Sequence, residues 1–409
     1  MKIRHLFMFF LVISLMLTGC QTRIKPTSSE NTDLQDNTSS HENIGSQGSV
    51  PIGTCDWVRG LSPVPDRRMG LDRNFAANIA NGENGVFISQ NDYVYYLEDG
   101  MDILLPLCGR PDCTHTTDDC NAYVKDCGQI TFYDGYLYVY VGEQSTYKCE
   151  IVRLDPDGSN HVTVIDLLDF AKSHGGTYTQ SWFMSEGYCF FGLCTMEEID
   201  DGDGDDVTQS FMGKNIGNFY YKLDGSEGEP QKRNVQEDLP IGQIYSCGNT
   251  ILAFSNVPQN GGEYGSYWEW HSETDTFTYL MDMPSSAGYF DDTAGYYHDD
   301  GAIWRYTYAT GKAEIMVQTG LNGKYQLMAY PDSIVLFSAS GEDYTLYIYN
   351  WEYELVEAVS VEGYGNYVSS ILIGETAERF LLSGKGGYHF ISKSELGVGT
   401  AEIHPIEQW

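Results

Sequence analysis

The chain is built largely from variations on one unit, Asp134-Gly-Tyr-Leu-Tyr-Val-Tyr-Val141. Its three tyrosines alternate with Leu137, Val139 and Val141, which is the two-residue period of a β-strand, and the opening Asp-Gly pair supplies a turn. Both faces of this strand are apolar or aromatic. We therefore expect it to lie between two packed layers rather than on a sheet that is open to water on one side.

Similar phrases recur along the chain, at residues 92–97, 187–191, 249–254, 295–297, 332–337 and 378–382. A short apolar stretch usually precedes the phrase, and two further strand-like stretches usually follow it. Four strands repeated every 40 to 60 residues, roughly, are typical of propeller blades. The sequence thus predicts an all-β fold, a single β-propeller of seven four-stranded blades. Six or eight blades remain possible, and a pair of β-sandwiches is the alternative.

Blade 1, near residues 84–107, lacks one strand of this repeat. The missing strand could come from residues 73–79, or from residues 401–406 near the end of the chain. The second choice would close the ring.

Composition supports the β class and argues against one kind of partner. The chain has 31 Tyr, 44 Gly and 14% aromatic residues, and 58 acidic side chains outnumber 23 Lys and Arg to give a net charge of -35. A phosphate backbone is bound through clustered basic residues, so nucleic acid is not an expected partner. The acidity indicates solubility, with loose binding of divalent cations as the alternative.

The first 54 residues have the layout of an export signal followed by a tether. Lys2 and Arg4 precede an apolar run that ends Leu17-Thr-Gly-Cys20 and is shorter than the roughly 20 residues that span a membrane. Residues 21–50 are polar and contain no aromatic side chain, which predicts disorder. We predict a signal peptide at 1–19, Cys20 and a disordered tether at 20–54, and the propeller at 55–409.

The ending Leu-Thr-Gly-Cys20 resembles the lipobox of bacterial lipoproteins. This resemblance implies that Cys20 is diacylated and becomes the first residue of the mature protein. The protein would then be exported and anchored to the outer face of the bacterial cytoplasmic membrane, at the cell surface. An ordinary leader, cleaved elsewhere with Cys20 incidental, is the alternative.

The most specific local feature is a cysteine-rich loop, residues 108–127, in the connection between blades 1 and 2. Its first part contains Cys108, Cys113, His115 and Cys120. Three thiolates and one imidazole form a complete tetrahedral set for a structural zinc ion, although the gaps are wider than in common zinc clips. Disulfides are the alternative for an exported protein, and reduced, unpaired thiols are a third possibility.

The remaining cysteines leave the pairing open. Ten cysteines minus the lipidated Cys20 leave nine, so at least one thiol is free or bound to metal if all the others pair. Local bridges could join Cys127 to Cys149 or Cys189 to Cys194. For Cys189, the role of a small core residue is favoured.

The lipobox, the polar tether, the tyrosine-rich blades and the Cys-His loop with Pro111, Ala122 and Tyr123 together resemble a group of exported propeller lipoproteins of Gram-positive anaerobes, similar to WD40-like and YVTN-like propellers. The resemblance covers the whole chain. It implies a propeller fold and a cell-surface location, and it implies no reaction or catalytic residue.

An acidic insertion at residues 197–215 suggests a calcium site. Asp201, Asp203 and Asp205 alternate as the first oxygen ligands of a calcium loop do, but Asp206 replaces the expected glycine and Met212 the expected bidentate acid. A solvated acidic loop is the alternative to a bound calcium ion.

A tryptophan pair suggests a ligand platform. Trp268 and Trp270 are expected on one face of a strand and Tyr267 on the other, with Tyr264 in the glycine-rich stretch before them. Exposed, these rings would stack on a sugar or an extended peptide, and buried, they would pack one blade on the next.

No motif of a known catalytic class occurs, so the sequence assigns no catalytic residue. The favoured interpretation is a non-enzymatic binding module, expected as a monomer, for a glycan, peptide or protein. The alternative is an extracellular hydrolase or lyase with acidic side chains converging at the channel mouth, which would require carboxyl groups of raised pKa.

Overall fold

The computed structural model describes residues 78–409 except 83–84, 144–147, 177, 186, 200–209, 227, 233–240, 248–249, 256, 262–264, 272–275, 283–287, 291–292, 331, 339–342 and 365–371. Across these residues the chain is β-structure apart from a short helix, α2 (Leu168–Ser173), and a 3-10 turn, η2 (Lys393–Glu395). Within the described part, no helix combines the length and the apolar character that a bilayer span requires. The predicted signal peptide, Cys20, the tether and the start of the propeller at residue 55 lie outside the described residues.

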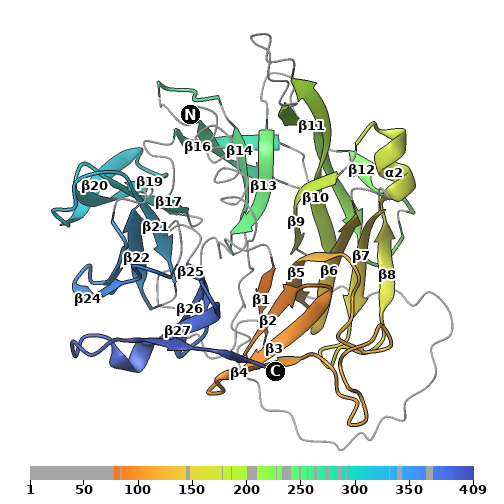
Figure 1. Ribbon diagram of the computed structural model, residues 1–409. Coiled ribbons are helices and arrows are strands. Elements are labelled where there is room, and N and C mark those ends of the chain that lie inside the picture. Colours follow the sequence, from red (N-terminus) through yellow and green to blue (C-terminus); the bar gives the residue numbers. More distant parts are fainter. Residues whose placement is uncertain are drawn as a thin grey trace, which may run out of the picture.

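The strands form seven sheets arranged around a ring (Figure 1). Each sheet contains four strands that follow one another in the chain and pair antiparallel, and the first sheet carries a fifth strand at its edge. The predicted fold, a single all-β propeller of seven four-stranded blades, is therefore confirmed. Each blade is a local structure, because its four strands pair with one another within about 40 to 60 consecutive residues.

The first four blades run from residue 79 to residue 282. Blade 1 contains β1 (Ile79–Asn81), β2 (Gly85–Gln90), β3 (Tyr93–Glu98) and β4 (Ile103–Pro106). Blade 2 contains β5 (Cys127–Tyr133), β6 (Tyr136–Glu143), β7 (Lys148–Leu154) and β8 (Val162–Asp166). Blade 3 contains β9 (Tyr178–Ser185), β10 (Tyr188–Ile199), β11 (Ser210–Lys222) and β12 (Gln231–Lys232). Blade 4 contains β13 (Ile241–Cys247), β14 (Thr250–Ser255), β15 (Ser266–His271) and β16 (Thr276–Asp282).

The last three blades complete the ring. Blade 5 contains β17 (Gly288–Phe290), β18 (Ala294–Asp299), β19 (Ala302–Thr307) and β20 (Lys312–Gln318). Blade 6 contains β21 (Tyr325–Ala329), β22 (Ile334–Ser338), β23 (Thr345–Tyr349) and β24 (Leu355–Ser360). Blade 7 contains β25 (Leu372–Glu375), β26 (Arg379–Gly384), β27 (Gly387–Ser392) and β28 (Ile403–Pro405).

The repeated aromatic phrase occupies the second strand in blades 2 to 7. In β6, Leu137 and Tyr138 point to opposite faces and both are fully buried, so this strand is covered on both sides as its sequence predicts. Blade 1 differs, because its phrase forms β3, the third strand, and β2 takes the second position.

Apolar clusters cross every boundary between neighbouring blades. One cluster joins blades 1, 2 and 3, a second joins blades 3, 4 and 5, and three more join blades 5 with 6, 6 with 7, and 7 with 1. Several of these boundaries carry an aromatic pair: Phe87 with Phe132, Phe190 with Trp270, Tyr296 with Trp351, and Tyr330 with Phe380. The core is thus a closed belt between blades, which explains why both faces of the strands are apolar.

The missing strand of blade 1 comes from the upstream side, where β1 overlaps the predicted stretch 73–79 at Ile79, and residues 73–77 lie outside the described residues. The first strand of blade 1 is β1, which begins at Ile79. Residues 401–406 do not complete blade 1, because β28 (Ile403–Pro405) pairs with β27 as the fourth strand of blade 7. Instead β29 (Glu407–Gln408) joins the outer edge of blade 1 as a fifth strand, parallel to β4. Arg379 adds an ion pair from blade 7 to Asp102 of blade 1, with a nitrogen-to-oxygen distance of 2.8 Å.

Candidate metal centre

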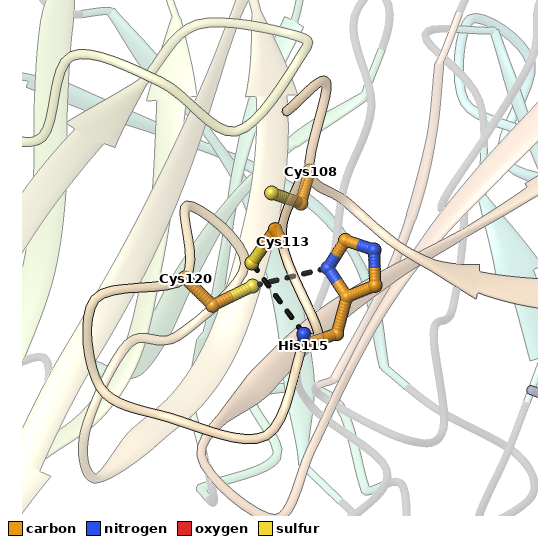
Figure 2. A group of neighbouring side chains, drawn as sticks. All are labelled: Cys108, Cys113, His115 and Cys120. Atoms are coloured by element: carbon orange, nitrogen blue, oxygen red, sulfur yellow. Dashed lines mark hydrogen bonds between the residues drawn. The ribbon is translucent and has the colours of Figure 1, made fainter. Parts of the chain in front are cut away.

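The strand β4 leads into a loop, residues 108–120, that we call the Cys-His loop. Two tight turns shape it: the backbone N–H of Cys113 donates to the carbonyl of Arg110 (3.3 Å), and that of Cys120 donates to the carbonyl of Thr117 (3.1 Å). These turns bring the side chains of Cys108, Cys113, His115 and Cys120 together, as Figure 2 shows. We call these four side chains the Cys-His cluster.

The geometry of the cluster suits a tetrahedral metal ion. The three sulfur atoms and one imidazole nitrogen lie within 4.8 Å of one another, and Nδ1 of His115 is 3.4 Å from Sγ of Cys120. In a tetrahedral zinc site, bond lengths of about 2.0 to 2.3 Å place neighbouring ligand atoms about 3.5 to 3.8 Å apart. The cluster could therefore hold a metal ion such as zinc after small side-chain movements.

The cysteines whose side chains are described all carry free thiols: Cys108, Cys113, Cys120, Cys127 and Cys189. Of the local bridges that the sequence allowed, Cys127 and Cys189 are described and free, while the side chains of Cys149 and Cys194 lie outside the described part of the chain. Cys189 is fully buried in the core that joins blades 1 to 3, in agreement with its favoured role as a core residue.

The thiols of the cluster differ in acidity. Burial by itself would raise the pKa of Cys108, but hydrogen bonds from the backbone at Arg110 and Asn121, and from the thiols of Cys120 and Cys113, lower that pKa below its usual value. Burial, together with the neighbouring thiols, raises the pKa of Cys120 to about 12. The loop thus favours the thiolate form of Cys108 and the protonated form of Cys120. A bound cation would displace the remaining protons.

An arginine inside the loop ties its two halves together. Nη1 of Arg110 donates to the carbonyl of Asp119 at 2.6 Å, and the guanidinium lies 3.7 Å from the Asp119 carboxylate and 3.8 Å from that of Asp112. These groups are exposed, so their contribution to global stability is small. Their effect is to hold Cys113 and Cys120, which lie next to these acids, at a fixed separation.

The turn between β7 and β8 of blade 2 supports the loop from outside. Gly158, in the left-handed region with φ of 82°, approaches so closely that an added Cβ would lie 1.9 Å from the carbonyl oxygen of Leu107. Nε2 of His161 donates to the carbonyl of Asn121 at 2.9 Å. Neither contact was evident from the sequence, because both join residues far apart in the chain.

The tryptophan pair is split between core and surface. Tyr267 and Trp270 are buried, and Trp270 meets Phe190 of blade 3 edge-on at 5.3 Å. Trp268 is half-buried, and its Nε1 donates to the hydroxyl of Ser266. Burial keeps Tyr267 and Trp270 from forming an open platform, and they take the alternative role of packing one blade on the next.

Other predicted site residues lie outside the described residues. These are Cys20, the calcium candidates Asp201, Asp203 and Asp205, and Tyr264 of the platform.

No family model matches the chain, and no curated protein matches its sequence. Solved propeller-like structures do match at low similarity. PorZ, a surface component of the type-IX secretion system of Porphyromonas gingivalis, is 9% identical over 86% of this chain and 39% of its own, with a TM-score of 0.46. TolB from Acinetobacter baumannii is 14% identical over 65% of this chain and 64% of its own, with a TM-score of 0.36.

An oligogalacturonate lyase from Vibrio parahaemolyticus is 10% identical over 63% of this chain and 71% of its own, with a TM-score of 0.36. This chain spans well under half the length of the PorZ chain. Similarities this low assign no activity to this chain. The propeller assignment rests on the seven sheets themselves.

Proposed function

We propose that the chain is an exported propeller, anchored through a lipidated Cys20, that binds a glycan, peptide or protein without transforming it. In this proposal the Cys-His loop is a structural zinc site. Zinc would hold the connection between blades 1 and 2 in one conformation and would present the surrounding surface as a rigid platform.

The observation that favours binding over catalysis is the direction of the carboxyl pKa values. Five carboxyl groups have a pKa held below the usual value, mainly because hydrogen bonds stabilise the charged form: Asp119, Asp157, Asp224, Asp343 and Glu395. For Asp343 burial opposes this shift, but hydrogen bonds from Thr345, Tyr325 and Tyr347 outweigh it. A general acid for glycosidic cleavage needs the opposite shift.

The observation that supports zinc is the spacing of four ligand atoms within 4.8 Å at a place where the chain needs a fixed connection. All four ligands are neutral or anionic electron-pair donors, and a Cys3His set is typical of structural zinc sites.

The metal proposal is tested by native mass spectrometry and metal analysis of the chain purified with its thiols reduced. We expect one zinc ion per chain, lost in Cys113→Ser and in His115→Ala. Cys127→Ser is the matched control, because this free thiol lies just beyond the loop and outside the cluster. A reduced wild-type chain that takes up no zinc would contradict the proposal.

The binding proposal is tested by an assay that measures ligand binding and ligand turnover together. The detergent-extracted chain is incubated with cell-wall polysaccharides, a panel of plant and microbial glycans, and peptide mixtures. Bound ligand and released products are then measured in the same samples. We expect saturable binding with unchanged ligand. Unsaturated sugars, new reducing ends or cleaved peptides would favour a lyase or hydrolase instead.

The anchor is tested separately. Replacing Cys20 by Ala should move the protein from the membrane fraction to the soluble fraction, and the mature wild-type chain should carry the mass of two acyl chains. A Cys20→Ala chain that stays in the membrane fraction would argue against lipidation at this residue.

A further inference from the structure

The metal candidate and the closure of the ring share one strand, β4. Cys108 lies two residues beyond Pro106, the last residue of β4, and its backbone N–H donates back to the Pro106 carbonyl at 2.8 Å. The closing strand β29 pairs with β4 as well, and the backbone N–H of Trp409 donates to the carbonyl of Leu104 at 3.2 Å. One short strand thus carries the Cys-His loop at its end and the last residues of the sequence along its edge.

A side-chain contact joins these two features directly. The ring of Trp409 lies edge-on to the imidazole of His115, with 4.9 Å between the ring centroids and 83° between the planes. Among the described residues, Trp409 is the one aromatic ring that contacts His115. Trp409 itself is 62% exposed, so burial in the core does not account for its position.

His115 is the member of the cluster that most needs positioning. It has a left-handed backbone conformation with φ of 54°, and Nδ1 has to face the three sulfur atoms. Histidines that bind metal are normally held in orientation by a second partner on the ring, and loss of that partner weakens metal binding. Here the second partner is an indole from the far end of the chain.

We infer that Trp409 is a positioning residue for the metal ligand His115, and that zinc binding and docking of the closing strand β29 therefore stabilise each other. This inference rests on the proposed zinc site. Thermodynamic linkage makes the effect reciprocal: whatever the docked strand adds to zinc affinity, bound zinc adds equally to docking of the strand.

The first test measures zinc affinity by competition with a chromophoric chelator, using the full chain. Replacing Trp409 by Ala should weaken zinc binding by about 3- to 10-fold, the size expected for loss of one aromatic contact. Deletion of residues 407–409 should weaken it at least as much, whereas Trp409→Phe, which keeps a ring, should retain most of the affinity. Val398→Ala is the matched control, because Val398 is similarly exposed and lies between β27 and β28 of blade 7, outside the Cys-His cluster.

The second test looks at the converse effect by hydrogen exchange. Removing zinc from the wild-type chain should speed amide exchange in β29 and in the facing part of β4, while the buried strand β22 of blade 6 stays protected. The Cys113→Ser chain should show the faster exchange whether or not zinc is added. A zinc-dependent change in β22 of the same size would point to general loosening and would overturn the inference.

The outcomes separate this inference from the zinc proposal. A wild-type chain that binds no zinc contradicts the proposed site, and the inference with it. A wild-type chain that binds zinc, with equal affinity in Trp409→Ala and no change of exchange in β29, leaves the site standing and overturns the inference alone.

Discussion

Two polar clusters lie at junctions between blades, and they obtain their positive charge in different ways. At the junction of blades 6 and 7, Nζ of Lys393 lies 2.5 Å from the carboxylate of Glu375 and 3.0 Å from that of Asp332. The Glu375 side chain is 3% exposed. Burial alone would lower the pKa of Lys393, but the two carboxylates raise it above its ordinary value.

The Cys-His cluster, at the junction of blades 1 and 2, consists of electron-pair donors alone, and in our proposal its cation comes from solution. With the proposed zinc bound, the same architectural task, fixing one blade to the next, depends on sequence at one place and on metal supply at the other. Blades 6 and 7 should therefore respond to substitution of a single lysine, and blades 1 and 2 to chelation. The predictions below probe that contrast.

The largest effect is expected for Lys393→Met. The substitution leaves the buried Glu375 carboxylate without its partner, and breaking a buried pair in this way costs about 3–5 kcal/mol. The free energy of unfolding, measured by urea denaturation, should fall by that amount, and added zinc should not restore it.

A double variant checks the reason for that loss. Lys393→Met combined with Glu375→Gln removes the stranded charge, so it should be clearly more stable than Lys393→Met alone, in a double-mutant cycle. Equal stabilities of the single and double variants would mean that the ion pair is not what holds this junction.

A smaller effect is expected for Gly158→Ala, which acts on the other junction. Its Cβ would lie 1.9 Å from the Leu107 carbonyl, so either the turn or the start of the Cys-His loop has to move. We expect a loss of about 1–3 kcal/mol in unfolding free energy, in the range of overpacking and backbone strain, together with weaker zinc binding.

Gly135→Ala is the matched control for that substitution. Gly135 has nearly the same backbone, φ of 77° against 82°, but nothing lies within 4 Å of an added Cβ. The difference between the two variants therefore isolates the contact with Leu107 from the strain at positive φ. If both lose the same stability and keep the same zinc affinity, the turn does not support the loop.

The contrast between the junctions also explains what the sequence could predict. The blades and the Cys-His cluster were predictable because they are local: four strands or four ligands fall within a short stretch of chain. The ion pair between Lys393 and Asp332 was not predictable, and neither was the contact of Trp409 with His115. These contacts form where neighbouring blades, or the closing strand and blade 1, pack together, and no local period records which distant residues then meet. Trp270 shows the same limit, because its alternating pattern fits a surface platform and a core position equally well.

The prediction of the strand that closes the ring was wrong for a related reason. Residues 401–406 and 407–409 have similar short extended patterns, and pairing partners at such an edge depend on where blade 7 ends. The sequence correctly indicated a closing strand near the C-terminus. It assigned that strand to residues 401–406, but β28 in this stretch completes blade 7, and β29 closes the ring.

The smallest effect concerns a third buried ionisable group, His298, which has no counter-ion partner. It is 2% exposed, and its Nε2 lies 3.0 Å from the hydroxyl of Thr319. That hydroxyl donates onward to the Gly301 carbonyl, so Nε2 carries the proton, and the buried Nδ1 has no hydrogen-bond partner.

Burial lowers the pKa of His298, although Asp299 opposes the shift. Because the folded pKa is depressed, the unfolded chain binds the proton more readily. The contribution of His298 to stability is therefore present above about pH 6.5, the ordinary histidine pKa, and is lost as pH falls through the folded pKa. In His298→Gln the stability difference from wild type should shrink as pH falls from 8 to 5.5.

Lys393→Met combined with Glu375→Gln provides the comparison over the same pH range, because this double variant leaves no stranded Glu375 carboxylate to titrate. The pKa of Lys393 is raised above about 10.4, so its contribution is complete below that pH and should stay constant from pH 8 to pH 5.5. Urea denaturation of wild type and both variants at several pH values measures the two dependences side by side. A constant difference for His298→Gln would show that His298 has the same pKa in the folded and unfolded chain, and the interpretation of its unpartnered Nδ1 would fail.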